Sequence, residues 1–419
     1  MFLRALAGLA VLLFIGSGCV HEPAKTLAPR TGQWRMELDL AGNSLPFLFD
    51  LQRVDSTGWI ARIHNASEVI EVRDIEFRGD TFLMRMPLFD SEFKGLVLSD
   101  SVITGHWHNY LKGPEYRVPF FAQAGMVHRF TGPADGAIGF EGNWETHFSR
   151  GTKDAYDAIG IFDQHDDGTV TGTFVTETGD YRFLEGSVYQ DSMKLSCFDG
   201  SHAFLFNGKL RGDSITGHFW SGTHWEEDWV AYRSPNYKLR DPDSLTFLKE
   251  GYDMAEFSFP DLDGTPVSPR DQRFKGKVLM LQIMGSWCPN CVDETVVLNE
   301  LYENYATQGL EVIAVAFEKY PSTEKAIEGL KRFRSTLGVE YPILYAGQAS
   351  KEHAAAKLPF LDRIMSYPTC IFVDRNGKVR RIRTGFYGPS TGEHFTNYTR
   401  NLRSFVEQLL NEPVAVAAK

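Results

Sequence analysis

Residues 278–291 read VLMLQIMGSWCPNC, and this stretch decides the fold of the C-terminal half of the chain. Its first seven residues form an almost continuous apolar run, which is typical of a strand buried on both faces of a sheet. Cys288 and Cys291 follow at a spacing of three, and Pro289 is suited to the first position of a helix. We therefore predict a strand, a turn and a helix that begins at a pair of thiols.

The beginning of a helix is a favourable place for an ionised sulfur. Its first turn carries unpaired backbone N–H groups and a partial positive charge, which stabilise an anion. We expect Cys288 to be the nucleophilic thiolate and Cys291, almost one turn further on, to attack a mixed disulfide formed on Cys288. The alternative is that the two cysteines bind zinc. A structural zinc site needs two more protein ligands at suitable spacing, and the sequence offers no such pair.

Strands and helices alternate in the region around this pair. The pattern predicts strands over 278–284, 310–317 and 341–345, helices over 291–306 and 322–337, a hairpin of strands over 369–373 and 379–384, and a last helix over 392–410. Ser322 is the expected N-cap of the second helix. This order predicts an α/β domain with a mixed sheet over residues 253–412.

Three segments of this domain together resemble the thioredoxin superfamily, and within it the TlpA-like family of exported thiol–disulfide oxidoreductases. They are the motif from Trp287 to Cys291 after a buried strand, the stretch FSFPDLDGTPVS at 257–268 with KGKV at 275–278, and Ser366-Tyr367-Pro368-Thr369 before a strand. The resemblance covers about residues 253–411 and implies a thioredoxin-like fold.

The resemblance also implies roles for individual residues. Cys288 and Cys291 would form a redox-active disulfide, tuned by Pro289 and Asn290 between them, and no metal or organic cofactor would be required. A cis Tyr367-Pro368 bond would lie beside the cysteines and expose backbone to a substrate chain. The substrate-binding residues implied in this way are Trp287, Tyr367, Pro368 and Thr369.

Two positions leave points of mechanism open. Thioredoxins have a buried Asp at the position of Gln282, which cannot titrate, whereas Glu294 stands where the TlpA-like family often has a Glu. We hypothesise that Glu294 helps to take the proton from Cys291, and the alternative is a solvated Glu that favours the helix start. Asn290 replaces a Pro that is frequent in reducing members, so the direction of electron flow is open.

Other candidate side chains have simpler interpretations. Cys370 lies two residues after Pro368 and is either a third redox thiol or a small core residue. Cys197 is expected in a core. His106, His108 and His218 are expected to be structural or solvated, because the sequence shows no carboxylate cluster near them.

The N-terminal half, from about residue 31 to residue 232, lacks long helical periodicity. Short alternating runs rich in Val, Thr, Phe and Tyr are separated by turn signals, which predicts an all-β meander closing as a barrel or a sandwich. We expect tight hairpin turns at Asp167-Gly168 and Asn207-Gly208, because such pairs tolerate positive φ.

This half repeats itself at an interval of about 110 residues. The matches include TGQW at 31–34 with EGNW at 141–144, and ITGHW at 103–107 with ITGHF at 215–219. We predict two related β units, residues 31–131 and 132–232, and a polar linker over 233–252. The units are either two packed barrels or two halves of one sheet system.

The beginning of the chain differs from the rest. A short positive start, an apolar run over residues 5–15 and small residues ahead of Cys19 make the pattern of a secretory signal. It resembles a bacterial lipoprotein signal over residues 1–19, in which Cys19 would become the acylated first residue, followed by a tether over 20–30. An ordinary cleaved signal is the alternative. We expect a lipid-anchored protein of the periplasm or cell envelope.

Composition narrows the classes of function. The net charge is −11 and no long basic run occurs, so we expect no nucleic-acid partner. The expected function is disulfide exchange with envelope proteins, in the reducing direction, with a membrane or periplasmic electron donor. The alternatives are a disulfide oxidase or isomerase, and a binding lipoprotein in which the β-rich half recruits the ligand or client.

Overall fold

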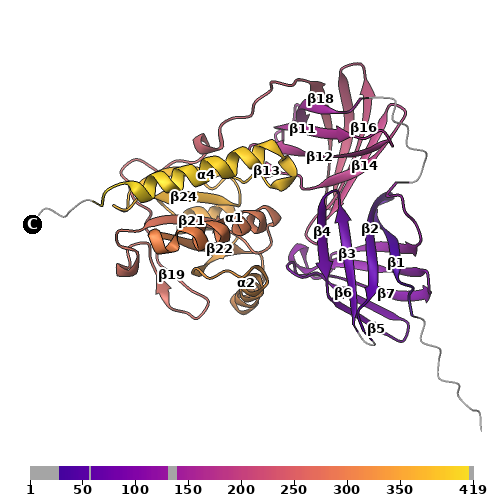
Figure 1. Ribbon diagram of the computed structural model, residues 1–419, viewed down its shortest axis with the longest axis horizontal. Helices are drawn as coiled ribbons and strands as arrows, with labels where there is room; N and C mark the ends of the chain where they lie inside the picture. Colours follow the sequence, from indigo (N-terminus) through magenta and orange to yellow (C-terminus); the bar gives the residue numbers. More distant parts are fainter. Residues whose placement is uncertain (1–27, 56–57, 131–138, 415–419) are drawn as a thin grey trace, which may run out of the picture.

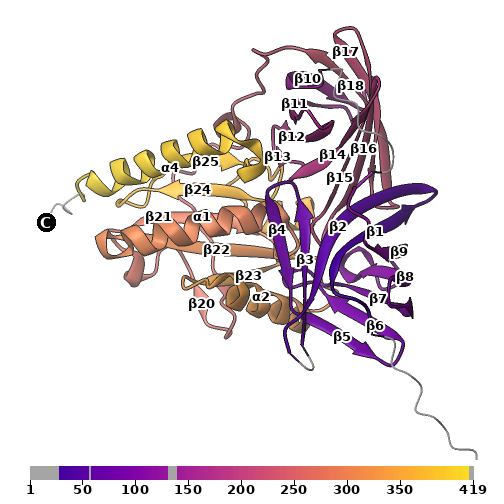
Figure 2. The ribbon, with the colours of Figure 1, turned by 45° about the vertical axis from the view of Figure 1, so that its right-hand side comes forward.

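Figure 1 shows a computed structural model of the protein, in which residues 28–55, 58–130 and 139–414 are described. The chain forms two β units and one α/β domain, and both β units lie on the same side of the α/β domain (Figures 1 and 2). The predicted signal over 1–19, with Cys19, lies outside the described residues. Within the described ranges, no helix combines the length and the apolarity needed to cross a membrane.

The first unit is a nine-stranded antiparallel sheet in the order β4-β3-β2-β1-β9-β8-β7-β6-β5. Its strands are β1 (Gly32–Leu40), β2 (Asn43–Arg53), β3 (Trp59–Asn65), β4 (Glu68–Val72), β5 (Asp74–Arg78), β6 (Thr81–Arg85), β7 (Ser91–Ser99), β8 (Val102–Asn109) and β9 (Arg117–Ala124). The sheet curls until β3 contacts β5, so its inner face encloses a core that contains Trp34, Phe93 and Trp107.

The second unit closes into a barrel, because β11 pairs with both β10 and β12. The strands are β10 (Gly142–Phe148), β11 (Tyr156–Gln164), β12 (Thr169–Thr176), β13 (Gly179–Asp180), β14 (Leu184–Tyr189), β15 (Ser192–Phe198), β16 (Ala203–Arg211), β17 (Ser214–Ser221) and β18 (Trp225–Arg233). The N-terminal half is therefore all-β, as expected, and of the two arrangements left open it has two barrel-like sheets.

The repeat seen in the sequence is visible in equivalent hydrogen bonds. Trp34 Nε1 donates to the carbonyl of Arg30 at 3.0 Å, and Trp144 Nε1 donates to the carbonyl of Phe140 at 2.8 Å. Each indole is fully buried and reaches back four residues. The same hydrogen bond, from a buried Trp side chain to the carbonyl four residues earlier, therefore fixes the beginning of the first strand in both units.

One predicted turn is wrong. Asp167-Gly168 does connect β11 to β12, but Asn207-Gly208 lies inside β16, and the turn after β16 is made around Gly212 at φ +61. A Cβ on Gly208 would come within 3.0 Å of the Trp229 ring, so this glycine permits close packing across the sheet. The Asn207-Gly208 pair therefore matches the sequence pattern of a turn, but Gly208 serves the packing between strands and not a turn.

Phe198 of β15 joins the two β units. Its ring lies in the core of the first unit, stacked on Phe47 with ring centroids 4.7 Å apart and at 5.1 Å from Trp107. Asn65 of the first unit donates to the Phe198 carbonyl at 2.9 Å and accepts from its N–H at 3.2 Å. The first unit thus completes its core with a residue of the second.

The α/β domain is built on a five-stranded mixed sheet in the order β23-β22-β21-β24-β25. Its strands are β21 (Val278–Met284), β22 (Leu310–Glu318), β23 (Ile343–Gln348), β24 (Thr369–Val373) and β25 (Val379–Thr384), and its helices are α1 (Pro289–Tyr305), α2 (Thr323–Leu337), α3 (Lys351–Lys357) and α4 (Glu393–Asn411). The strands β21, β22 and β23 are parallel, and β24 and β25 add antiparallel pairs.

Apolar side chains cover both faces of this sheet. Residues of α1, α2 and α4 form one core with it, among them Leu298, Leu330 and Val406. The other core includes Ala354 of α3 and Phe259 of the small hairpin formed by β19 (Phe259–Pro260) and β20 (Pro266–Val267). This is a thioredoxin-like arrangement, with the β21–α1 junction at the edge of the central strands.

The predicted elements of this domain are present, with shifted ends. The hairpin of β24 and β25 has the predicted bounds, and Ser322 caps α2 by accepting from the N–H of Lys325. The helix α1 begins at Pro289 rather than at residue 291, because Cys288 is its N-cap. In the segment predicted as a linker, Thr246 is buried with its hydroxyl 2.7 Å from that of Thr384.

Candidate redox site

Strand β21 and helix α1 place the two cysteines. Cys288 is the N-cap of α1, and its Sγ accepts a hydrogen bond from the N–H of Cys291 at 3.3 Å. Both are free thiols; Cys288 is 6% exposed, and Cys291 is fully buried. The geometry makes Cys288 the sulfur that a disulfide reaches first and Cys291 the sulfur behind it.

The Tyr367-Pro368 peptide bond is cis, as the resemblance implies, and the loop that contains it faces the cysteines. The carbonyl oxygen of Tyr367 accepts from the Cys288 thiol at 3.5 Å. Pro368 is buried, and so is Thr369, whose hydroxyl donates to the Ser366 carbonyl at 2.9 Å. The Thr369 side chain therefore braces the loop and does not face the solvent.

Trp287 is held firmly beside Cys288. Its Nε1 donates to the Phe317 carbonyl at 3.0 Å, and its ring meets the Tyr367 ring edge-on with centroids 5.5 Å apart. The ammonium of Lys319 lies 3.6 Å from the ring centroid, a cation–π contact. The indole is partly exposed, so it forms a fixed apolar surface next to the sulfur.

Cys291 and Glu294 share a buried polar pocket with Gln282. Burial and the adjacent Cys288 sulfur raise the pKa of Cys291 well above its usual range. Gln282 Nε2 donates to Glu294 Oε2 at 3.0 Å and lies 3.3 Å from the Cys291 carbonyl, whereas Glu294 Oε1 has no hydrogen-bond partner in the described part of the chain. Burial raises the pKa of Glu294 to about 7. Glu294 is 1% exposed, so the alternative of a solvated residue is wrong.

A second buried carboxyl near the site was missed by sequence reasoning. Glu318 ends β22, is fully buried, and accepts from both the N–H and the hydroxyl of Ser286 at 2.8 Å. Burial raises its pKa to about 7. The available signal was an ionisable residue directly after the apolar run over 312–317. Through its bonds to Ser286, Glu318 holds the turn just before Trp287.

The two other cysteines among the described residues, Cys197 and Cys370, lie in cores. Cys370 is 1% exposed, sits opposite Gln282 in the β21–β24 pairing, and burial raises its pKa well above the usual range. Cys197 is fully buried in the second barrel. As for metals, the described residues contain no group of three or more His, Cys, Asp or Glu side chains that could hold an ion.

Cys288 faces a cleft of about 920 Å³ between the α/β domain and the β half. The α/β wall includes the motif residues Trp287, Cys288, Pro289 and Asn290 together with Lys319 and Tyr367. The opposite wall includes Lys112 of the first unit and Tyr181, His202, Phe204, Phe219 and His224 of the second. The β half is therefore one side of the redox site.

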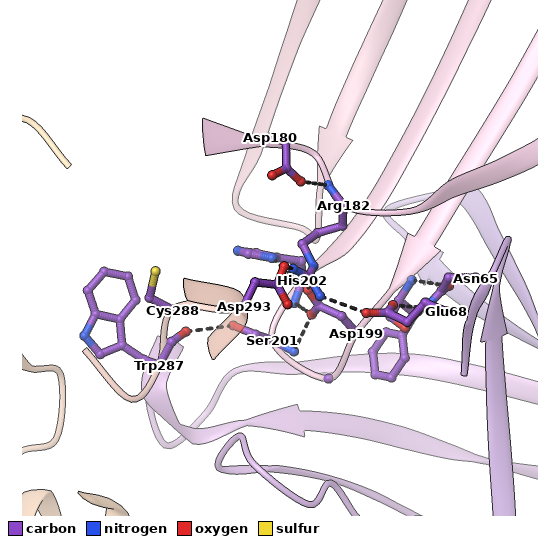
Figure 3. Close-up of polar contacts among 12 residues, drawn as sticks. Asn65, Glu68, Asp180, Arg182, Asp199, Ser201, His202, Trp287, Cys288 and Asp293 are labelled. Carbon is purple, nitrogen blue, oxygen red and sulfur yellow. Dashed lines mark hydrogen bonds and ion pairs between the residues drawn. The ribbon is translucent and has the colours of Figure 1, made fainter. Parts of the chain in front are cut away.

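Arg182, in the loop after β13, connects all three parts of the molecule (Figure 3). Its guanidinium bonds Glu68 of the first unit at 2.8 Å, lies 3.5 Å from Asp199 of the second, and forms an ion pair with Asp293 of α1. Arg182 is buried, and burial raises the pKa of Asp293 to about 6 although the guanidinium opposes this. The redox helix is thus tied to both barrels through one side chain.

Two further contacts bring the second barrel to the motif itself. The hydroxyl of Ser201 donates to the Trp287 carbonyl at 3.2 Å, and Gly179 of β13 lies so close to Asn290 that a Cβ would be 2.3 Å from its Nδ2. Neither residue was predicted, because no local pattern links them to a motif about ninety or more residues away.

Comparisons with known proteins agree with this geometry. The Redoxin family matches residues 249–400. Thiol-disulfide oxidoreductase ResA of Geobacillus thermodenitrificans is 30% identical over 140 residues, which are 33% of this chain and 72% of that protein. Thioredoxin-like protein YneN of Bacillus subtilis is 31% identical over 138 residues, which are 33% of this chain and 73% of that protein.

A crystal structure of a thiol:disulfide interchange protein from Chlorobium tepidum TLS is 21% identical and has a TM-score of 0.30, covering 39% of this chain and 99% of that one. The Redoxin match spans α1, with Cys288 and Cys291, and the cis-proline loop. With a ResA relative at this identity and coverage, the chain belongs to the ResA-like family of thioredoxin-fold thiol–disulfide oxidoreductases.

Proposed function

We propose that this enzyme reduces disulfides of envelope proteins through Cys288 and Cys291, without a metal or an organic cofactor. The observation that carries the proposal is the combination on α1 of a reachable sulfur, a buried sulfur behind it, and a buried carboxyl with one free oxygen. Electrons need no other carrier, because two thiols hold the pair that a disulfide accepts.

The reaction follows from the positions of these groups. The Cys288 thiolate attacks one sulfur of the client disulfide, forms a mixed disulfide, and expels the other client sulfur as a thiolate that takes up a proton. Glu294 then accepts the proton of Cys291, and the Cys291 thiolate attacks Cys288. This second step releases the other client thiolate and leaves a Cys288–Cys291 disulfide, so two electrons have passed to the client. A dithiol donor in the membrane or periplasm restores the enzyme.

The reduction potential of the Cys288–Cys291 pair decides the direction of electron flow. We expect a reduction potential nearer to about −270 mV, as in thioredoxin, than to about −120 mV, as in DsbA. Equilibration with a glutathione or dithiothreitol buffer measures it, and a value near the upper figure would assign an oxidase.

Attachment to a membrane completes the proposal. An acyl chain on Cys19 would hold the enzyme at the envelope, and the tether over 20–30 would leave the cleft free to meet clients. Metabolic labelling with a fatty acid, compared between the wild type and Cys19→Ala, tests this part.

The chemistry itself is tested by mixed-disulfide capture. Cys291→Ser is expected to accumulate client proteins bound to Cys288, because the resolving sulfur is gone, and Cys288→Ser is expected to capture none. Non-reducing gels of the native envelope, followed by identification of the trapped proteins, give the result. Cys370→Ser is the matched control and should retain the activity, since that thiol is buried. Activity that survives in both Cys288→Ser and Cys291→Ser would refute the proposal.

A further inference from the structure

We propose that the cleft contains a carboxylate-binding subsite built on Lys112 and Lys319, so that preferred substrates carry a carboxylate beside their disulfide. The proposal rests on the disulfide chemistry above and adds the substrate class. It also gives the β half a direct part in choosing the substrate, since Lys112 belongs to the first β unit.

Lys112 lies at the end of the short 3-10 helix η1 (Tyr110–Lys112), where it lines the cleft. Its ammonium donates to the His224 ring at 3.1 Å. Burial and Lys112 lower the pKa of His224 to about 4, so at neutral pH this ring is an uncharged acceptor. Lys112 is thus positioned by a neutral partner, and among the described residues its ammonium forms no direct ion pair with a carboxylate.

Lys319 directly follows β22 and is the second cation of the subsite. Its ammonium sits on the Trp287 ring, and it is close enough to Lys112 to lower the pKa of that lysine, which burial and this repulsion together bring to about 8. In the portion of the chain that the structure describes, neither ammonium forms an ion pair with a carboxylate. Two cations that line the cleft beside Cys288 therefore lack a directly paired carboxylate among the described residues, although Asp199 acts on Lys112 and Glu318 on Lys319 at longer range.

The four carboxylates that line the same cleft among the described residues are engaged elsewhere, and the first of them, Asp157, lies 2.7 Å from the His147 ring. Glu227 accepts from the hydroxyls of Tyr156 at 2.8 Å and Ser149 at 2.5 Å. Glu177 bonds Arg240, and Asp180 accepts from the N–H of Gly388 at 2.7 Å. Lys112 is half-buried, whereas Lys319 is exposed. Since a partly desolvated cation such as Lys112 is costly without an anion, a carboxylate supplied by the substrate stabilises this end of the cleft.

The size of the cleft limits how the carboxylate arrives. About 920 Å³ admits a small molecule or an extended segment, and the barrel wall opposite Cys288 keeps a folded domain at a distance. The shared chemistry is a disulfide with a carboxylate close to it. The source is either an acidic segment of a client chain or a small acidic disulfide such as oxidised glutathione.

The test compares kcat/KM for cystine peptides that differ only in flanking residues, Glu, Gln or Lys, and for oxidised glutathione. We expect the wild type to prefer the Glu peptide, and Lys112→Gln to lower kcat/KM for it about tenfold while changing the Gln peptide by less than about twofold. Lys112→Arg should retain the preference, which excludes a folding defect. Lys209→Gln, far from the cleft and paired with Asp191, is the charge-matched control.

The outcomes separate the inference from the proposed function. Loss confined to the Glu peptide identifies a client chain as the source, and loss confined to glutathione identifies a small disulfide. Equal turnover of the three peptides by the wild type together with an unchanged rate for oxidised glutathione in Lys112→Gln, or equal slowing of all four substrates in Lys112→Gln, overturns the subsite alone. A wild type that reduces no disulfide overturns the proposed function as well.

Discussion

Glu294 is a carboxyl group in an almost water-free place. One oxygen is bound by Gln282, and the other has no partner among the described residues. Cys291, three residues earlier on α1, must lose a proton during turnover. A carboxylate is costly in such surroundings and a neutral carboxyl is not, which is why the pKa of Glu294 rises to about 7. The group can therefore gain or lose a proton at the pH at which the enzyme works.

The raised pKa of Glu294 should make the free energy of unfolding depend on pH. Between its ordinary pKa of 4.5 and its folded-state pKa of about 7, the folded chain holds a proton that the unfolded chain releases, so the free energy of unfolding falls as pH rises. We expect Glu294→Gln to match the wild type near pH 4 and to exceed it by about 2 kcal/mol at pH 8. Urea unfolding across this range measures the difference.

The same variant separates a catalytic role from a purely structural one. Glu294→Gln should form mixed disulfides at the wild-type rate but resolve them about a hundredfold more slowly. Glu300→Gln, on the exposed side of α1, is the control and should change neither quantity. Parallel stability curves for Glu294→Gln and the wild type would mean that Glu294 is not the titrating group.

At the scale of elements, the ion pairs of Arg182 connect α1 to both β units. Removing the guanidinium in Arg182→Met would leave Glu68, Asp199 and Asp293 facing one another with no cation among them. We expect a loss of about 3–5 kcal/mol in unfolding free energy, because breaking a buried ion pair strands its charges. Chemical denaturation gives the value, and faster hydrogen exchange in α1 would locate it.

Arg240→Met is the appropriate comparison for that variant. It removes the pair between Arg240 and Glu177, in which the arginine is 66% exposed, and should leave the free energy of unfolding almost unchanged, because water screens such a pair. Equal losses in the two variants would show that the Arg182 cluster does not hold the parts together.

Most helices and strands of the α/β domain that have a clear sequence pattern were predicted well, but a strong turn pattern in the β half was misleading and very short elements were not predicted. The hairpin of β24 and β25 was predicted to the residue, since the apolar run TCIFV and the run VRRIRT, which has Val379 and Ile382 among its arginines, flank an obvious turn over 374–377. Asn207-Gly208 carries an equally strong turn signal but lies within β16, where Gly208 packs closely against the Trp229 ring. The helix α3 and the β19–β20 hairpin are too short for periodicity to mark them.

At the scale of the whole molecule, the cysteine pair and the cis-proline loop could be predicted, but the opposite wall of the cleft could not. Arg182 meets its partners Glu68 and Asp293 across 114 and 111 residues. Lys112 and His224 meet across 112. No periodicity or spacing in the sequence predicts these contacts, because they form only when the folded domains pack against one another.

The insertion of Phe198 into the first β unit has a consequence for biosynthesis. The ribosome delivers the chain from its N-terminus, so strands β1 to β9 emerge well before the ring that fills the space between Phe47 and Trp107. Until that ring arrives, the early strands hold an unfilled interior and remain a target for chaperones and proteases. A nascent-chain series of increasing length should show protease resistance of the first hundred residues appearing only after residue 198 has left the exit tunnel.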